Sequence, residues 1–148
     1  MISHIYLGVR TFDAAVEFYS AVLPELGWRL KFEAERPSVG WQPATGERPL
    51  ILIGRPYNGE LADPGNGQMV ALLAPSRPAV DRFHAAALAN GGVSVGDPGL
   101  RPEYHPHYYG AECSIRTATS SAPAVTIPNS RVHFDAAPEP LAVTSSAR

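Results

Sequence analysis

Histidine and tyrosine side chains gather at two places in the sequence, in the segment HIY (4–6) and in the segment EYHPHYYG (103–110). In an extended backbone, residues two apart point to the same side, so His105 and His107 can act on one ligand. An imidazole can bind a metal ion, exchange a proton near neutral pH or orient a bound molecule. For the second segment we favour contact with a substrate over metal binding. The predicted substrate contacts there are His105, His107, Tyr108 and Tyr109.

The strand expected at residues 2–9 separates polar from apolar side chains. Ile5, Leu7 and Val9 share one face of this strand, which is the pattern of a half-buried strand. His4 and Tyr6 therefore share the opposite face. We predict that Tyr6 lines a cavity, and that His4 either binds a metal ion or only faces that cavity.

Trp41 stands in a short strand-like segment, SVGWQPA (38–44). Aromatic side chains supply much of the wall of small-molecule pockets, so Trp41 is a further predicted substrate contact. Packing in the core is the alternative for this side chain, since large aromatic residues also fill cores.

The chain of 148 residues is 45% hydrophobic and 18% charged, a composition typical of one globular domain. The formal net charge of -2 indicates no basic surface for nucleic acid. No apolar run approaches the ~18 residues of a membrane span, and the first residues lack the pattern of a signal peptide. The single cysteine, Cys113, excludes an internal disulfide and a cysteine metal cluster. We expect a cytoplasmic protein that binds neither nucleic acid nor membrane.

Residues 4–27 and 69–92 align without a gap. The identical pairs include Leu7 and Leu72, Ala14 and Ala79, Phe18 and Phe83, Leu23 and Leu88, and Gly27 and Gly92. Thr11 and Ser76 also coincide, and a hydroxyl at either position can accept a hydrogen bond from a free amide of the first helical turn. The agreement through strand, cap, helix and glycine predicts a duplicated unit.

Each copy is predicted to be a strand followed by a helix. The first helix, residues 12–26, buries a stripe at helical spacing, and Pro24 loosens its last turn. That stripe consists of Ala15, Tyr19, Val22 and Leu26. The second helix, residues 77–90, is predicted to bury Val80, Phe83, Ala87 and Leu88. Gly91 offers it a left-handed end, and His84 is expected on its surface.

Three strand-like segments follow the first helix, at residues 28–35, 38–44 and 49–56. A linker rich in Gly, Pro, Asn and Asp follows at residues 57–68. The first module therefore reads β-α-β-β-β, and the second copy begins in the same way. We predict an α+β fold of two tandem modules, at about residues 1–58 and 68–111.

A duplicated β-α-β-β-β unit that opens with HIYLGV and continues with FDAAVEFYSAVLPELGW resembles the vicinal oxygen chelate superfamily. This group includes glyoxalase I, bleomycin-resistance proteins, fosfomycin-resistance enzymes and extradiol dioxygenases. The resemblance covers residues 1 to about 111 and implies curved sheets that form a half-open barrel around a small-molecule cavity. It also implies a homodimer. One fold hosts many reactions, so the resemblance alone does not name the activity.

In metal-using members of this superfamily, one divalent ion (Zn, Ni, Mn or Fe) is held by residues on the first and last strands of both modules. By resemblance, His4 fits the first of these places. Leu52 and Met69 stand at two others, and neither side chain suits such an ion. Two functions stay open. One is a metal-dependent lyase or dioxygenase-related enzyme, and the other is a metal-free protein that sequesters a small aromatic or cationic drug or toxin.

The pattern of a compact module stops after about residue 111, which leaves the second module incomplete. Residues 112–148 are rich in Ser, Thr, Ala and Pro, the composition of a low-complexity tail. Read out of frame, SIRTATSSA (114–122) is compatible with Asp-Pro-Asp-Gly-Asn-Lys-Leu-Cys, a turn that by resemblance introduces the missing last strand. We therefore predict a slip of reading frame near residues 111–114, with a natural tail as the alternative. Within this tail, AVTIP (124–128) can pair with an exposed sheet edge.

The nucleotide sequence across codons 108–130 tests the slipped frame. We expect the shifted frame to read GAT-CCG-GAC-GGC-AAC-AAG-CTC-TGC or its synonyms, because the fixed bases of the present codons allow all eight. Bases that forbid these codons would show that the tail is genuine and must be explained as structure in its own right.

Overall fold

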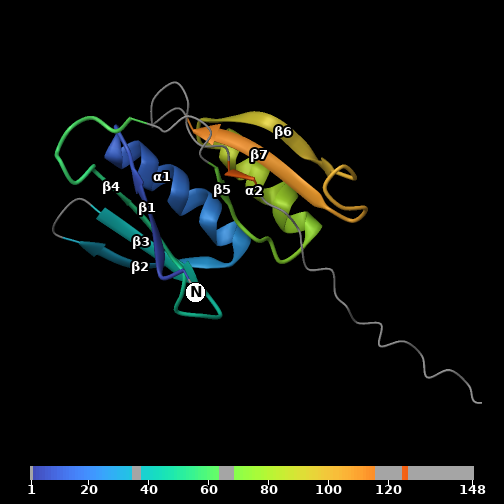
Figure 1. Cartoon of the computed structure of the whole chain (residues 1–148), viewed down its shortest axis with the longest axis horizontal. Helices are drawn as coiled ribbons and strands as arrows, with labels where there is room; N and C mark the ends of the chain where they lie inside the picture. Colours follow the sequence, from blue (N-terminus) through green and yellow to red (C-terminus); the bar gives the residue numbers. More distant parts are fainter. Residues whose placement is uncertain (1, 35–37, 64–68, 116–124, 127–148) are drawn as a thin grey trace, which may run out of the picture.

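The computed structural model describes residues 2–34, 38–63, 69–115 and 125–126. Two modules lie side by side, and each packs one helix against one four-stranded sheet (Figure 1). The first module contains β1 (His4–Gly8), α1 (Phe12–Val22), the 3-10 helix η1 (Leu23–Leu26), β2 (Trp28–Ala34), β3 (Ser38–Pro43) and β4 (Leu50–Gly54). The second contains β5 (Val70–Ala71), α2 (Arg77–Ala89), β6 (Gly92–Leu100), β7 (Tyr109–Ile115) and β8 (Val125–Thr126).

The two sheets repeat one topology. Their strand orders are β1-β4-β3-β2 and β5-β8-β7-β6. In each sheet the first strand of the module pairs in parallel with the last, and the other pairs are antiparallel. Neither sheet closes on itself. The predicted α+β fold of two tandem β-α-β-β-β modules with a half-open curved sheet is confirmed.

The second sheet reaches beyond the boundary expected at residue 111. β7 continues to Ile115, and β8 lies inside the segment AVTIP. β8 pairs with β5 and β7, in the place that β4 takes in the first sheet, rather than at an outer edge. It has two residues where β4 has five, so the second sheet is complete in order but short. Residues 116–124 lie outside the described part of the chain, so the slipped frame stays a prediction.

The core lies between the helices and the faces of the sheets that they cover. Phe18 on α1 and Phe83 on α2, which are equivalent in the repeat, are each 1% exposed. The stripe predicted for α1 is buried throughout, and the turn that contains Pro24 is the 3-10 helix η1 instead of a continuation of α1. The buried stripe of α2 includes His84, whereas Leu88 is 44% exposed, which reverses the prediction for these two residues.

His84 can be buried because β6 supplies a partner for its ring. Its side chain is 9% exposed, and its Nε2 atom lies 2.9 Å from Ser94 Oγ. Ser94 Oγ donates its own proton to Asp97 Oδ1 at 2.7 Å, so His84 Nε2 must carry a proton and donate it to Ser94. Buried polar groups need such partners. The helical pattern alone does not reveal the partner of His84, because Ser94 lies on another element.

The helix ends follow the predicted chemistry in part. Ser76 Oγ accepts a hydrogen bond from the backbone amide of Ala79 at 3.3 Å, as expected of an N-cap. Thr11 makes no side-chain cap, so that half of the prediction is wrong. Gly91 has a φ of +86°, the left-handed conformation predicted for the end of α2. No helix in the described part of the chain is long and apolar enough to cross a membrane.

Gly92, at the start of β6, lies directly against the backbone of α2. A Cβ atom there would stand 2.7 Å from the carbonyl oxygen of Ala87. Backbone atoms cannot move aside as the end of a side chain can, so we expect Gly92→Ala to lower the free energy of unfolding by about 1–3 kcal/mol in urea denaturation. Gly46→Ala is the matched control, because the nearest atom to a Cβ at that position is 3.9 Å away. Equal losses in both variants would contradict the close packing.

Candidate functional site

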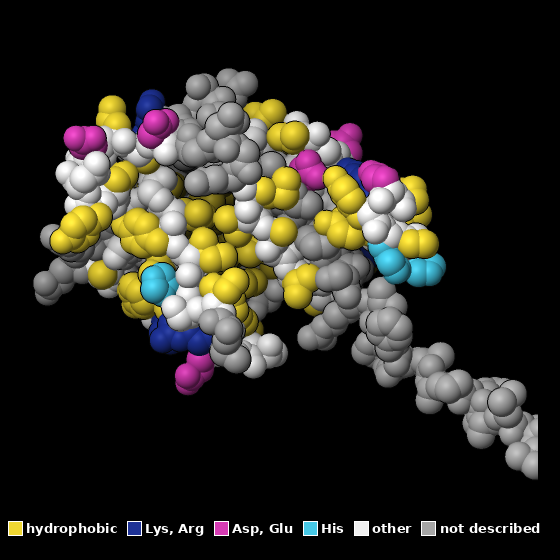
Figure 2. Space-filling view, viewed as in Figure 1, with side chains coloured by type: hydrophobic (Ala, Val, Ile, Leu, Met, Phe, Trp, Pro, Cys, Tyr) yellow, Lys and Arg dark blue, Asp and Glu magenta, His cyan; other side chains and the backbone are white. Residues whose placement is uncertain are grey.

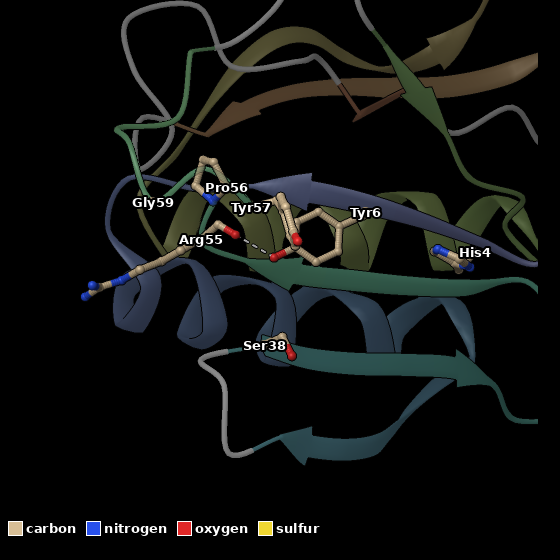
Figure 3. Close-up of a pocket in the computed structure, with 7 residues that line it drawn as sticks. All are labelled: His4, Tyr6, Ser38, Arg55, Pro56, Tyr57 and Gly59. Atoms are coloured by element: carbon tan, nitrogen blue, oxygen red, sulfur yellow. Dashed lines mark hydrogen bonds between the residues drawn. The ribbon is translucent and has the colours of Figure 1, made fainter.

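A pocket of about 530 Å³ lies on the face of the first sheet that α1 does not cover. His4 and Tyr6 of β1 line it, whereas Leu7, on the opposite face of the strand, packs against the core. The lining residues, drawn in Figure 3, are His4, Tyr6, Ser38, Arg55, Pro56, Tyr57 and Gly59. All of them belong to the first module and the turn after β4. The volume is in the range of ordinary small-molecule sites.

The pairing of β1 with β4 sets the length of the pocket. Their parallel register places His4 opposite Leu50 and Gly8 opposite Gly54. Arg55 follows Gly54, so it lies five residues along the strand direction from His4, which is ~16 Å at about 3.3 Å per residue. Figure 3 shows His4 and Arg55 toward opposite ends, with Tyr6 between them.

A side-chain hydrogen bond links β1 to the residue that follows β4. Tyr6 Oη donates to the backbone carbonyl oxygen of Arg55 at 2.7 Å, which fixes the ring of Tyr6 in place (Figure 3). At the other end, Ser3 Oγ lies 2.9 Å from Nδ1 of His4. Nε2 of His4 has no partner among the described residues. The pocket therefore offers an oriented aromatic ring and an imidazole nitrogen for contact with a ligand.

The structure brings two of the predicted site residues, His4 and Tyr6, into this pocket. Trp41 lies on the opposite face of the sheet, where it is 1% exposed and packs in the core with its ring 6.2 Å from that of Tyr19. Its environment is the packing alternative that the sequence left open. The cause is the alternation of β3, which turns Trp41 toward α1 and Ser38 away from it.

The segment with His105 and His107 forms the turn between β6 and β7, in the second module, and does not line the pocket. The two rings are 5.7 Å apart between centroids, and Tyr108 packs edge-on against Tyr104. Figure 2 shows exposed histidines in separate places on this face of the molecule, which agrees with the separation of this turn from β1. His4 and the histidines of this turn therefore lie in two separate regions of the molecule.

Tyr109 is held by α2 instead of facing a cavity. Its hydroxyl donates to Asp81 Oδ1 at 2.7 Å, and the guanidinium of Arg77 lies 5.3 Å from its ring centroid. The bond to the Asp81 carboxylate raises the pKa of Tyr109, because losing the proton would leave two negative charges side by side. Burial is the main cause that raises the pKa of the neighbouring Tyr108. Neither hydroxyl is poised as an acid or base near neutral pH.

Sequence reasoning missed the residues at the far end of the pocket. Arg55, Tyr57 and Gly59 fall in or beside a segment read as a strand end and a linker. Their position depends on β4 pairing with β1, to which it is not adjacent in the chain. One signal for their position was available. If the last strand of a module pairs in parallel with the first, the residues just after the last strand lie beside the end of the first strand.

The described residues of the pocket do not provide the donor set of a catalytic metal centre. Catalytic divalent ions generally take about three protein ligands and keep one open position. Among the lining residues that the structure describes, His4 is the single side chain of the His, Cys, Asp and Glu types. Nowhere in residues 2–34, 38–63, 69–115 and 125–126 do three or more such side chains group to hold a metal ion.

Comparison with solved structures identifies the fold. A glyoxalase/bleomycin resistance protein from Albidiferax ferrireducens T118 matches with a TM-score of 0.72 and 28% identity, over 86% of this chain and 97% of that one. A glyoxalase-related enzyme from Fulvimarina pelagi matches with a TM-score of 0.64 and 16% identity, over 86% of each chain. A glyoxalase/bleomycin resistance protein/dioxygenase family enzyme from Burkholderia phytofirmans PsJN matches with a TM-score of 0.63 and 16% identity, over 85% of this chain and 95% of that one. No protein-family model matches the sequence, and neither does any curated protein.

The chain therefore has the vicinal oxygen chelate fold, and the resemblance read from the sequence is confirmed. The fold is shared with proteins of several names, so it does not by itself assign a reaction.

Cys113 is a nucleophile by type, but its surroundings keep it inert. Its side chain is fully buried on β7, and this burial, with the nearby Asp97 carboxylate, raises the pKa of the thiol to about 11. The neutral thiol is thus favoured in the folded state. Its contribution to stability is present below the ordinary pKa of 9.0 and is lost as the pH rises through about 11.

We expect iodoacetamide to label native Cys113 at pH 8 at least about 100-fold more slowly than the urea-unfolded chain, since thiolate is the reactive species. Mass spectrometry over time measures both rates, and the unfolded chain is the control. Fast labelling of the native protein would contradict the buried position.

Proposed function

We propose that this protein binds a small molecule in the pocket of the first module, without a metal ion. The observation that carries the proposal is the composition of the lining. It combines two tyrosine rings, a proline, a serine and a single imidazole in a space of about 530 Å³. Mostly apolar walls with few polar groups are typical of sites that bind by shape and orientation.

Each polar group in the pocket has a part in this binding. Tyr6 gives a ring surface that its bond to the Arg55 carbonyl keeps oriented. Its hydroxyl oxygen still has lone pairs for a ligand donor. His4 Nε2 and Ser38 Oγ offer a second and third hydrogen-bonding position. Tyr57 is 96% exposed and can close over a bound molecule from the turn after β4.

A metal-dependent lyase is less well supported than binding. Of the places that hold the ion in metal-using relatives, His4 has a suitable side chain, while Leu52 lies beside Tyr6 in the strand register. One imidazole does not provide the ligand number of a catalytic site. Similar folds carry names that include both glyoxalase and bleomycin resistance, and the second kind of function needs no reaction.

We also propose the homodimer that the resemblance implies. Val93 and Val95 of β6 are 37% and 58% exposed on the face opposite Ser94, which contacts α2. Figure 2 shows other hydrophobic side chains gathered over the middle of the molecule, between the two modules. Such a surface is apolar enough to receive a second copy.

Binding of 2-naphthamide, a neutral aromatic probe, followed by its fluorescence, tests the metal-free site. We expect the Kd to stay within about twofold after dialysis against EDTA, and to rise about tenfold or more in Tyr6→Ala, because the ring platform is lost. Leu30→Ala is the control, since Leu30 is exposed on β2 outside the pocket.

Metal analysis of the purified protein gives the opposing result. Stoichiometric Zn, Ni, Mn or Fe that His4→Ala removes would overturn the metal-free proposal. A Kd for the probe that depends on added metal would do the same.

A further inference from the structure

Two tyrosine rings line the pocket from different elements. Tyr6 lies on β1, and Tyr57 lies in the turn after β4 (Figure 3). Aromatic rings in contact have centroids about 4.5–7 Å apart, and the rings of Tyr6 and Tyr57 are not in contact. A flat ring stacked between two others needs ~3.5 Å on each side, which is ~7 Å in all. The pocket therefore leaves room for one planar layer between the two tyrosines.

The backbone that carries Tyr57 is fixed by the turn itself. The amide of Gly59 donates to the carbonyl oxygen of Pro56 at 3.0 Å, and the amide of Glu60 donates to Asn58 Oδ1 at 3.1 Å. Gly59 takes a φ of +76°, a left-handed conformation that glycine adopts without strain. An ordered turn thus presents the side chain of Tyr57, which is 96% exposed.

Gly8, the last residue of β1, sets the position of this turn. A Cβ atom at Gly8 would stand 3.3 Å from Cγ of Pro56 and 3.8 Å from Cβ of Ala62. The lack of a side chain at Gly8 therefore lets Pro56 pack against the end of β1. Gly8 is two residues after Tyr6, so its open side is the face of β1 that carries the Tyr6 ring. The contact of Pro56 thus holds the neighbouring Tyr57 on the same side of the strand as Tyr6.

We propose that the ligand of this pocket is a planar aromatic ring system that stacks between Tyr6 and Tyr57, and that Tyr57 determines this specificity. The inference rests on the proposed function of the same pocket, and it adds the shape of the ligand. An aromatic ring gains from offset stacking or edge contact with each neighbouring ring, beyond the area that it buries. A saturated ring of the same size is thicker and makes no such contact.

Two neutral probes with the same amide group separate planarity from hydrophobic size: 2-naphthamide and its fully saturated analogue, decahydro-2-naphthamide. By titration calorimetry we expect 2-naphthamide to bind about tenfold more tightly, which is the combined gain from two ring contacts. In proton NMR the signals of the bound 2-naphthamide should also move upfield, because both of its faces lie against tyrosine rings.

Variants assign the preference to the second ring. In Tyr57→Leu, which keeps an apolar side chain without the ring, the preference for the planar probe should fall to about threefold. Tyr57→Phe should keep the full preference, since the Tyr57 hydroxyl forms no hydrogen bond with any residue that the structure describes. Tyr104→Leu is the control, because Tyr104 is 65% exposed in the turn between β6 and β7, outside the pocket.

A further variant acts on the turn instead of the ring. Gly8→Val should also lower the preference to about threefold, because its side chain would displace Pro56 and with it Tyr57. Gly46→Val is its control, since the nearest atom to a Cβ at that position is 3.9 Å away. Circular dichroism shows that each variant is folded. An undiminished preference in folded Gly8→Val would contradict the placement of Tyr57 by this contact.

The outcomes distinguish the two proposals. If both probes bind the wild type equally, or if Tyr57→Leu keeps the tenfold preference, the stacking inference is overturned and the binding pocket stands. If neither probe binds the wild type, both proposals fail together. A preference that Tyr57→Leu loses and Tyr104→Leu keeps would establish Tyr57 as the residue that selects planar ligands.

Discussion

Each module has one helix for a four-stranded sheet, and one helix can cover only one of the sheet's two faces. The covered face of the first sheet holds Trp41, Ile51 and Ile53, which pack against α1. The other face of this sheet is not covered by α1, and it carries the pocket. Every feature of the site follows from this division, because the alternation of each strand decides which side chains are core and which are lining.

The parallel pairing of β1 with β4 then determines which residues lie at each end of the pocket. β4 is the last strand of its module but the neighbour of the first, so the turn that follows it returns beside the end of β1. The hydroxyl of Tyr6 on β1 donates a hydrogen bond to the backbone carbonyl oxygen of Arg55, the first residue after β4. The backbone of the residue that follows β4 thereby meets a side chain of β1.

The second module repeats the topology without repeating the site. Met69 occupies the position of His4 in the repeat. The polar side chains of the second module lie elsewhere. Hydrogen bonds among His84, Ser94 and Asp97 join α2 to β6. The hydrogen bond from Tyr109 to Asp81 joins β7 to α2. The two modules thus share the packing of a helix on a sheet, while their open faces differ.

The sequence by itself determined the two modules, the buried stripe of α1, the cap at Ser76 and the face shared by His4 and Tyr6. These features depend on local periodicity and on hydrogen bonds within one or two turns, which a sequence displays directly. Only the tertiary structure decided that His84 is buried, that Trp41 packs in the core, that the His105 turn stands apart from His4, and that Arg55 completes the pocket. Each of these depends on which distant strand becomes a neighbour, and that is set by the packing of whole elements rather than by the residues beside them.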